Sequence, residues 1–476
     1  MKKTSTPQWM LALALSLGLM GSQSQAMDFK WSGTYRIEGY QFFNPELDKG
    51  VNKSYGLHHL ILRPEITAGD GFMIRARLDL LNSSDYPNSQ LGQFFGHGPG
   101  VATPGFAGES NTLGTAQASD TVAVNELYLT YIQEHGALIV GRAPVHFGLG
   151  MTHNAGLGPF DHWLNNRDLL GYRVVMGNFY LLPMLAKVNE GDITQGEDVN
   201  ELLFHAQYED LETELEMGFF FQRRRGSALA SDAPVGVNPG EVLGGTGAIA
   251  NDSFEIENFN FYVQRQIDLH KLGLEVGMQR GRSGVRTAGG EPVEFAGYGM
   301  AAEYEIQPQG SPWTWNLKAG YATGDSPATD EKFEGYLFHR NYNVAMMLFN
   351  QPLGQSDILR TDLQAEGPAS RGARVDTETL SNVIYASPGF RYDWRDSWAV
   401  EGALTFGWLD TNPIVGQDVG KDLGFELDLA LNYSPRQGVL WVNQVGMLFP
   451  GSAFEAGGQQ DASFAWGMVS KAAISF

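Results

Sequence analysis

The chain has 476 residues, of which 59 are glycine and 12% are aromatic, while charged residues make up only 18%. There is no cysteine, which excludes disulfides, thiolate metal sites and cysteine nucleophiles. A net charge of -22 argues against nucleic acid as a partner, because phosphate binding needs a basic surface. No apolar run approaches the roughly 20 residues of a membrane-spanning helix, so no such helix is expected.

The first 26 residues are predicted to be a secretory signal peptide that is removed from the mature chain. Lys2 and Lys3 form a basic start, and Met10 to Met20 is an apolar stretch too short to span a bilayer. The small residue Ala26 stands where a signal peptidase cuts. A buried N-terminal helix is the alternative interpretation. Cleavage would leave residues 27–476 as a single domain outside the cytoplasm.

The mature chain alternates apolar and polar residues almost from its first residue, which is the period of β-strands. The clearest segment lies near the C-terminus, where Leu423, Phe425, Leu427, Leu429, Leu431 and Tyr433 alternate with Gly424, Glu426, Asp428, Ala430, Asn432 and Ser434. A soluble β-sandwich would show the same period. Aromatic residues at segment ends and a polar face rich in Gly, Thr, Asn and Glu favour a membrane barrel with a wet lumen.

Eighteen strands are predicted, and sixteen remain an alternative because the alternation is weak between residues 136 and 208. The predicted strands lie at 28–42, 57–68, 71–82, 121–133, 136–144, 169–177, 178–188, 199–208, 212–224, 255–266, 271–283, 294–306, 313–324, 381–394, 397–410, 421–434, 438–450 and 463–476. Short turns alternate with long polar segments, which is typical of short periplasmic turns and long extracellular loops. The predicted fold class is an all-β, antiparallel up-and-down transmembrane barrel with both termini in the periplasm.

The last predicted strand resembles the final strand of bacterial outer-membrane proteins as a class. Phe464, Trp466, Met468, Ala472, Ile474 and Phe476 share one face, and the chain ends on an aromatic residue. The resemblance implies a multi-pass barrel in the lipids of a Gram-negative outer membrane, with Phe476 as the signal for the barrel-assembly machinery. Because the first strand directly follows the signal peptide, no plug, hatch or passenger domain is expected, which argues against TonB-dependent and fatty-acid transporters and autotransporters.

Eighteen strands enclose more space than side chains can fill, so we expect a water-filled lumen that only the protein's own loops can narrow. The alternation predicts basic pore-lining residues mainly in the early strands and acidic ones in the later strands. They are Lys30, Arg36, Arg63, Arg75, Arg77 and Arg142, against Glu214, Glu216, Glu275, Glu303, Glu305, Asp393, Glu401, Glu426 and Asp428. Such a lumen would have a transverse field that orients polar solutes; alternatively, the charges only keep it wet. The pair Arg75 and Arg77 could bind anionic groups bidentately.

Two long segments are candidates for loops that fold into the lumen. Residues 336–351 are too apolar for an exposed loop and would place His339, Arg340 and Asn341 at a constriction. An external cap is the alternative for this segment. Residues 141–173 are rich in Gly, Asn and Asp and form the second candidate. The histidines of this second segment lack metal-ligand spacing, so no metal site is expected.

Gly320 to Asp325 (GYATGD) resembles a feature of alginate-export-type porins, which are eighteen-stranded barrels with strongly cationic lumens. No HExxH, GxSxG or phosphate-loop motif is present, so neither catalytic residues nor a cofactor is expected. The predicted function is passive diffusion of small polar or charged solutes through an outer-membrane channel. The alternatives are a substrate-specific export or uptake barrel of the alginate-export type, a non-conducting structural or adhesion barrel, and an enzyme barrel with its site on the barrel wall. The sequence marks no subunit interface.

Overall fold

The computed structural model describes residues 27–476 apart from positions 49, 51 and 70 and segments 84–90, 95–121, 190–198, 227–252, 287–290, 326–330, 355–357, 359–378, 413–419 and 459–461. The predicted signal peptide lies outside the described residues. The only described helix is the short 3-10 turn η1 (Ser452–Gly458). None of the helices in the described ranges is long and apolar enough to cross a membrane.

The rest of the regular structure is β. The strands are β1 (Asp28–Phe43), β2 (Asn52–Ala68), β3 (Phe72–Leu80), β4 (Asn82–Ser83), β5 (Leu91–Phe94), β6 (Val122–Gln133), β7 (Gly136–Pro144), β8 (Asn166–Met176), β9 (Phe179–Asn189), β10 (Val199–Asp210), β11 (Leu215–Gly226), β12 (Phe254–Ile267), β13 (His270–Arg286), β14 (Pro292–Phe295), β15 (Tyr298–Ile306), β16 (Trp313–Ala322), β17 (Lys332–Phe333), β18 (Val383–Arg395), β19 (Trp398–Leu409), β20 (Asp422–Tyr433), β21 (Val439–Pro450) and β22 (Ala465–Ser475). The ranges match the predicted strands closely, except that the predicted strand 294–306 is divided into β14 and β15.

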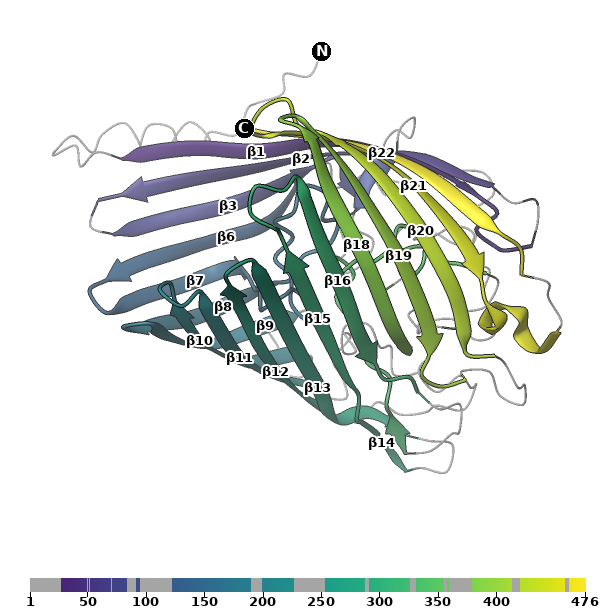
Figure 1. Ribbon diagram of the computed structural model, residues 1–476. Coiled ribbons are helices and arrows are strands. Elements are labelled where there is room, and N and C mark those ends of the chain that lie inside the picture. The colour runs from purple at the N-terminus through teal and green to yellow at the C-terminus, as the bar shows by residue number, and fades with distance from the viewer. Residues whose placement is uncertain are drawn as a thin grey trace, which may run out of the picture.

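Eighteen of these strands form one closed antiparallel up-and-down barrel (Figure 1). Neighbouring strands follow chain order, and the first and last strands close the sheet, with Thr34 of β1 opposite Ser475 of β22. Closure leaves the barrel without an open edge, as a hydrocarbon environment requires of a sheet. The other four strands, β4, β5, β14 and β17, are short pieces of two to four residues beside the ends of longer strands. The predicted count of eighteen is therefore confirmed.

The outer face carries the apolar half of the alternation. Its exposed side chains include Phe29, Trp31, Ile37, Phe72, Ile74, Leu127, Val140, Leu170, Leu185, Phe261, Leu274, Met300, Leu317, Ile384, Leu429 and Met468. A protein surrounded by water rarely exposes an apolar area of this extent, so the belt faces hydrocarbon. At the end of the barrel that has the short turns, called the turn end below, Trp313 packs against Trp315, Phe390 and Tyr392. Such a cluster is typical of an interfacial aromatic girdle.

One side chain of the clearest predicted strand lies on the opposite face from the expected one. The alternation places Leu423 outside, but its side chain is completely buried inside the barrel. The register explains the difference, because Gly407 pairs with Gly424 while Trp408 pairs with Asp422, which leaves Leu423 without a partner in the ladder. Gly424 has φ of 83°, a conformation that glycine adopts easily. This bulge turns Leu423 inward, and beyond it the predicted alternation resumes.

The C-terminal residue closes the seam between the first and last strands. Phe476 exchanges two backbone hydrogen bonds with Gly33, with N–O distances of 3.0 and 2.9 Å. The aromatic side chain remains exposed on the outer surface. The role of Phe476 as an assembly signal stays a prediction.

Candidate functional site

Two loops fold back into the barrel and pack against its inner face. Inner loop one comprises residues 145–165, between β7 and β8, and inner loop two comprises residues 334–354, after β17. Apolar side chains of both loops share one buried cluster with inward-facing residues of the wall; Trp163 belongs to the first loop and Phe338 and Met347 belong to the second. Both segments therefore lie inside the barrel rather than over its rim. Inner loop two contains the predicted segment 336–351, and inner loop one lies within the predicted segment 141–173, whose ends belong to β7 and β8.

Inner loop one crosses the barrel between opposite walls. At one end, Arg36 of β1 donates a hydrogen bond to the Asp161 carbonyl at 2.6 Å. At the other end, Glu275 of β13 accepts from the Thr152 hydroxyl at 2.9 Å and from the Thr152 backbone N–H at 3.2 Å. Strands β1 and β13 lie on opposite sides of the barrel (Figure 1), so the loop bridges the lumen between them.

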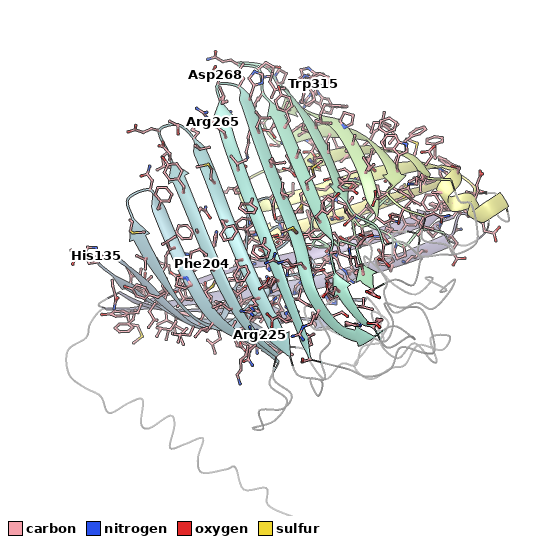
Figure 2. The ribbon with its side chains drawn as sticks, turned by 90° about the horizontal axis from the view of Figure 1, so that it is seen from below. His135, Phe204, Arg225, Arg265, Asp268 and Trp315 are labelled. Atoms are coloured by element: carbon pink, nitrogen blue, oxygen red, sulfur yellow. The ribbon has the colours of Figure 1, made fainter. Side chains whose placement is uncertain are left out.

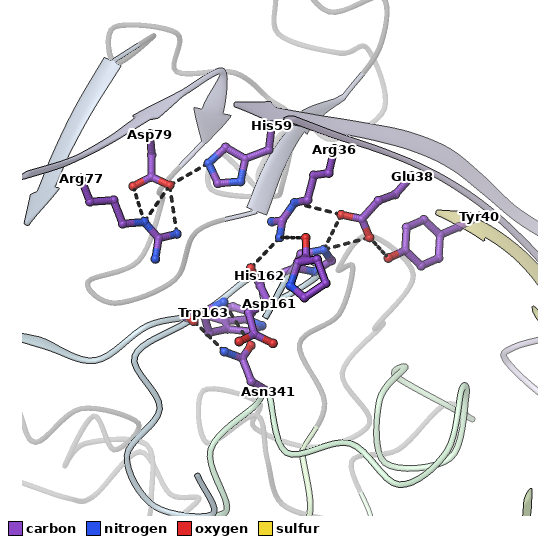
Figure 3. A network of polar contacts seen from close by, with 11 residues as sticks. Arg36, Glu38, Tyr40, His59, Arg77, Asp79, Asp161, His162, Trp163 and Asn341 are labelled. Atoms are coloured by element: carbon purple, nitrogen blue, oxygen red, sulfur yellow. Dashed lines mark hydrogen bonds and ion pairs between the residues drawn. The ribbon is translucent and has the colours of Figure 1, made fainter. Parts of the chain in front are cut away.

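A buried network of charges holds the first of these ends. Glu38 Oε1 lies 3.1 Å from Arg36 Nε and 2.8 Å from Nε2 of His162 in inner loop one. The Tyr40 hydroxyl donates to the other Glu38 oxygen at 2.6 Å. Figure 3 shows these groups converging between the wall and the loop. Arg36 and Glu38 are each only 1% exposed, so each charge needs the other's compensation to remain in this environment.

A second buried network lies beside the first. Arg77 forms an ion pair with Asp79, its Nε lying 3.0 Å from Oδ2, and His59 Nε2 lies 2.8 Å from Asp79 Oδ1. Arg77 also donates from Nη1 to the carbonyl of Gly156 in inner loop one at 3.1 Å. Arg77 therefore neutralises the Asp79 carboxylate and also binds inner loop one. Figure 3 shows the ion pair between Arg77 and Asp79.

Inner loop two is held by two carboxylates of β20. Glu426 accepts hydrogen bonds from the backbone N–H groups of Met347 at 2.8 Å and Leu348 at 2.6 Å. Asp428 accepts one from the backbone N–H of Met346 at 3.1 Å. Three consecutive N–H groups thus form an anion-binding concavity around these carboxylates. Unlike Glu38, neither carboxylate has an ion pair with a described Lys, Arg or His.

The two inner loops also bind each other. The Asn341 side-chain amide donates to the Trp163 carbonyl at 2.6 Å and accepts from the Trp163 backbone N–H at 3.2 Å. The Arg340 guanidinium lies 4.5 Å from the centre of the Trp163 ring. His339 donates its backbone N–H to the Met151 carbonyl at 2.7 Å. The predicted constriction residues His339, Arg340 and Asn341 therefore lie at the junction between the loops.

Burial at this junction changes the titration of two histidines. Desolvation lowers the pKa of His339 to about 3, and the nearby charge of Arg340 acts in the same direction. Desolvation also lowers the pKa of His153 to about 3, with a further contribution from Arg167. Both rings are therefore neutral at pH 7, and neither can be protonated in place without a cost.

Glycines in the wall make room for aromatic side chains of the loops. A Cβ atom on Gly299 of β15 would lie 2.6 Å from the Tyr336 ring and 2.8 Å from the Phe338 ring, which is closer than carbon atoms approach. A Cβ atom on Gly407 of β19 would lie 2.6 Å from the Phe349 ring. The close fit of inner loop two thus depends on the absence of side chains at these wall positions.

A polar cavity of about 740 Å³ lies between inner loop two and the turn end of the barrel. Its charged lining residues are Lys271, Lys318, Arg391 and Lys471 on the basic side and Glu303, Glu305, Glu401 and Asp428 on the acidic side. Arg391 lies 2.7 Å from Glu401, and Lys318 lies 3.4 Å from Glu303. The two signs are equally represented and interleaved in this wall, which also contains basic residues that the predicted list of later-strand acids left out.

The prediction for Arg142 is wrong, because it lies on the outer face with Leu127 and Val140 and pairs there with Asp168. The other predicted pore-lining residues differ in exposure. Arg36, Arg77, Glu275, Glu426 and Asp428 are buried under the inner loops. Arg63, Arg75, Glu216, Glu303 and Glu401 are partly exposed on the inner face, and Glu305 is exposed. Glu214 lies outside the strands, in the exposed turn before β11, where it lines a smaller cavity with Glu216. Whether any of them lines a solute path stays a prediction.

Sequence reasoning missed the basic residues of the cavity. Lys271 lies on the same face of β13 as Glu275, and Lys318 pairs directly with Glu303 across the β15–β16 ladder. Arg391 pairs in the same way with Glu401 across β18 and β19. The inward alternation that identified the acids contains these bases as well, and cross-strand pairing would have joined them. Within the described ranges, no group of three or more His, Asp or Glu side chains could hold a metal ion.

No protein-family model matches the chain, and no curated protein matches it in sequence. Solved structures do match its fold. OccK8 (OprE) of Pseudomonas aeruginosa aligns with a TM-score of 0.50 at 9% identity, over 94% of this chain and 98% of that chain. The fold is that of the outer-membrane porins. Two further neighbours are OccK9 (OpdG) of the same organism, with TM-score 0.49, 11% identity and coverage of 94% and 99%, and a BenF-like porin from Pseudomonas fluorescens, with TM-score 0.49, 9% identity and coverage of 94% and 98%.

This likeness concerns the fold, and the apolar belt on the outer face fits a barrel that spans a membrane. At such low identity it carries no information about the solute. The expected resemblance to alginate-export-type porins is not supported. The six residues from Gly320 to Asp325 lie at the end of β16 and just beyond it.

Proposed function

We propose that the protein is a passive outer-membrane channel for small polar or charged solutes, rather than an enzyme, and that inner loops one and two narrow its lumen. The observation that carries the proposal is the position of the two loops. They lie inside a closed barrel, are bound to its wall by buried polar groups such as Glu38 and Glu426, and adjoin a polar cavity of about 740 Å³. Loops of this kind set the size of solute that a wide barrel admits.

The lining of the cavity supports a polar solute. Four of its charges form the cross-strand pairs Lys318–Glu303 and Arg391–Glu401, and the amides of Asn316, Asn343 and Gln444 also line the cavity. A polar solute can replace the water on these groups with hydrogen bonds of its own. An apolar solute would leave them desolvated, which costs free energy for each unpaired group. Interleaved charges of both signs support neutral solutes, or solutes that carry charges of both signs, more than strongly anionic solutes.

The same proposal includes the maturation of the chain. Removal of residues 1–26 would leave β1 almost at the new N-terminus, since β1 begins at Asp28. The exposed Phe476, next to the seam between β1 and β22, would be the residue that the barrel-assembly machinery reads. Replacing Phe476 by Ser should reduce the amount of folded, heat-modifiable barrel while export across the inner membrane continues.

Planar-bilayer conductance of the purified full-length barrel tests the channel. We expect discrete, stable conductance steps, and a barrel that stays silent would instead be a non-conducting structural or adhesion barrel. Liposome swelling with neutral, anionic and cationic solutes of increasing size then defines the class that passes. A variant with a larger side chain at Gly299 serves as a matched comparison, because it displaces inner loop two without changing any charge.

A further inference from the structure

An arginine on the outer face of the barrel lies in apolar surroundings. Arg265 is exposed on the lipid-facing side of β12, two residues before the end of the strand. Its neighbours on that face are Val263 and Ile267 along the strand and Leu215 and Leu272 across the two ladders. No residue among those that the structure describes forms an ion pair or hydrogen bond with its guanidinium.

A groove begins at this arginine. It has a volume of about 420 Å³, within the ~300–1,000 Å³ of typical small-molecule sites. It lies over two consecutive rows of the sheet, and almost all of the lining surface is apolar. The first row is Arg265, Leu272, Tyr304 and Leu317, and the second is Val263, Leu274, Ala302 and Ala319. The two alanines are much smaller than their neighbours and form the floor of the groove.

The position of the groove along the barrel identifies the lipid leaflet. Arg265 lies near the turn that contains Asp268, at the same rim as Trp315 and opposite the rim of Arg225 (Figure 2). The short turns of outer-membrane barrels lie on the periplasmic side, and aromatic girdles mark the headgroup level. Arg265 is therefore at the height of the phosphates of the periplasmic leaflet, with the groove leading from it toward the bilayer centre.

We propose that Arg265 and this groove bind one phospholipid of the periplasmic leaflet, with its phosphate on the guanidinium and one acyl chain along Ala302 and Ala319. Arginine presents several N–H donors in a plane, which suits the paired oxygens of a phosphate. A headgroup alone would leave the apolar groove unfilled, and the unpaired cation of Arg265 favours an anionic group. Only an amphiphile with both parts satisfies the whole site.

A second copy of the chain is a competing occupant, but it fits the observations less well. A protein partner would have to present an acidic side chain to Arg265 and, at the same time, an apolar surface that fills the groove. A phospholipid brings the phosphate at the correct height as part of the surrounding solvent. The lipid therefore matches both the charge and the shape of the site without a further requirement.

Native mass spectrometry of the full-length barrel with added phosphatidylglycerol tests this proposal. We expect one retained lipid on the wild type, and a loss of roughly tenfold in its affinity for Arg265→Gln, as expected for one lost pair of charge-assisted hydrogen bonds. Ala302→Leu should cause a similar loss, because it fills the groove without changing any charge. Arg436→Gln, which removes an exposed arginine from a turn at the same rim, is the matched control and should retain the lipid.

Heat-modifiability establishes that each variant is folded before its lipid binding is compared. If Arg265→Gln does not fold, Arg265→Lys provides the same test with the charge retained and the planar donors removed. Equal lipid retention in the wild type, Arg265→Gln and Ala302→Leu would overturn the proposal. Loss in Arg265→Gln with full retention in Ala302→Leu would also overturn it, since the phosphate alone would then account for binding. Oligomers that Ala302→Leu dissociates would assign the groove to a second copy.

Discussion

The inner face of the barrel carries two sets of charged residues. The same alternation places both sets there, but the inner loops cover one set and leave the other exposed. Arg77 and Glu426 belong to the buried set, which the inner loops cover and bind. Arg75 and Arg391 belong to the exposed set, which faces the lumen and pairs across neighbouring strands. An inward-facing charge can therefore bind a loop or contribute to the electric field in the lumen. A buried charge has the first role, and an exposed charge has the second.

The two arginines of β3 provide the sharpest test of this difference, because they lie two residues apart on one face. Arg77→Ala should leave the completely buried Asp79 without its main counter-charge and remove the bond to Gly156. Breaking a buried pair in this way costs about 3–5 kcal/mol. The measurement is urea unfolding of the barrel in lipid vesicles.

Arg75→Ala is the matched control for that experiment. Arg75 lies 2.7 Å from Glu65, but the two side chains are 42% and 25% exposed, so water can replace their interaction. Exposed pairs contribute about 0–1 kcal/mol. Equal losses of stability in Arg75→Ala and Arg77→Ala would remove the basis for dividing the inward charges into two sets.

Glu426→Gln should release inner loop two while leaving the barrel intact. The substitution weakens the bonds from the Met347 and Leu348 N–H groups, and hydrogen bonds to charged groups contribute about 1.5–3 kcal/mol each. We expect a larger and noisier single-channel conductance and faster proteolysis within residues 334–354. Glu401→Gln, an isosteric change in the exposed set, should leave the conductance noise and the proteolysis as in the wild type. Similar noise in the two variants would contradict the docking role of Glu426.

Acid should also loosen the inner loops, through His153 and His339. Each pKa is lowered to about 3 in the docked loop from an ordinary value of 6.5. The released loop therefore binds protons that the docked loop excludes, so docking is fully favoured above about pH 6.5 and weakens as the pH falls toward 3. At pH 4.5 the loss is about 2–3 kcal/mol for each histidine.

Conductance recorded between pH 7.5 and 4.5 checks this expectation. The groups that face His153 are Arg167, Arg224, Glu201 and His339, and those that face His339 are Arg340 and His146. The double variant His153→Gln/His339→Gln keeps polar side chains at both positions and removes their titration. Its conductance should change less with pH than that of the wild type. An unchanged pH response in this variant would assign the effect to other groups.

The sequence predicted the strands well because alternation is a local property of the wall. It placed Arg36, Arg77, Glu426 and Asp428 on the inner face, and their burial there agrees with that orientation. It could not show that they would be covered, because burial depends on loops that return from distant parts of the chain. The bond between Arg36 and Asp161 joins residues 125 positions apart, and nothing near Arg36 in the sequence signals it.

Local exceptions limited the prediction in a different way. The inward turn of Leu423 depends on a bulge at Gly424, and a glycine within an alternating segment has many possible conformations. The basic residues of the cavity were missed because Lys318 and Arg391 form ion pairs with residues on neighbouring strands. Predicting them requires the register of the sheet and not only the facing of each residue.

The smallest expected effect concerns ion selectivity in the exposed set. Arg391 lies 2.9 Å from Asp393 and 2.7 Å from Glu401 and is 44% exposed in the cavity wall. Arg391→Ala would leave two carboxylates without their shared cation and shift the balance of four basic and four acidic lining residues toward negative. The reversal potential under a salt gradient should move toward cation preference, while the free energy of unfolding changes by about 0–1 kcal/mol.

Arg391→Lys keeps the charge and is the matched control for this shift. Glu401→Ala should move the reversal potential in the opposite direction, because it removes one acid and leaves Arg391 paired with Asp393. Both shifts should grow as the salt concentration falls, since the Debye length increases from about 10 Å at 0.1 M to about 30 Å at 0.01 M. If the reversal potential of Arg391→Ala equals that of Arg391→Lys at low salt, the cavity wall does not face the conduction path, and the exposed set has no electrostatic role in permeation.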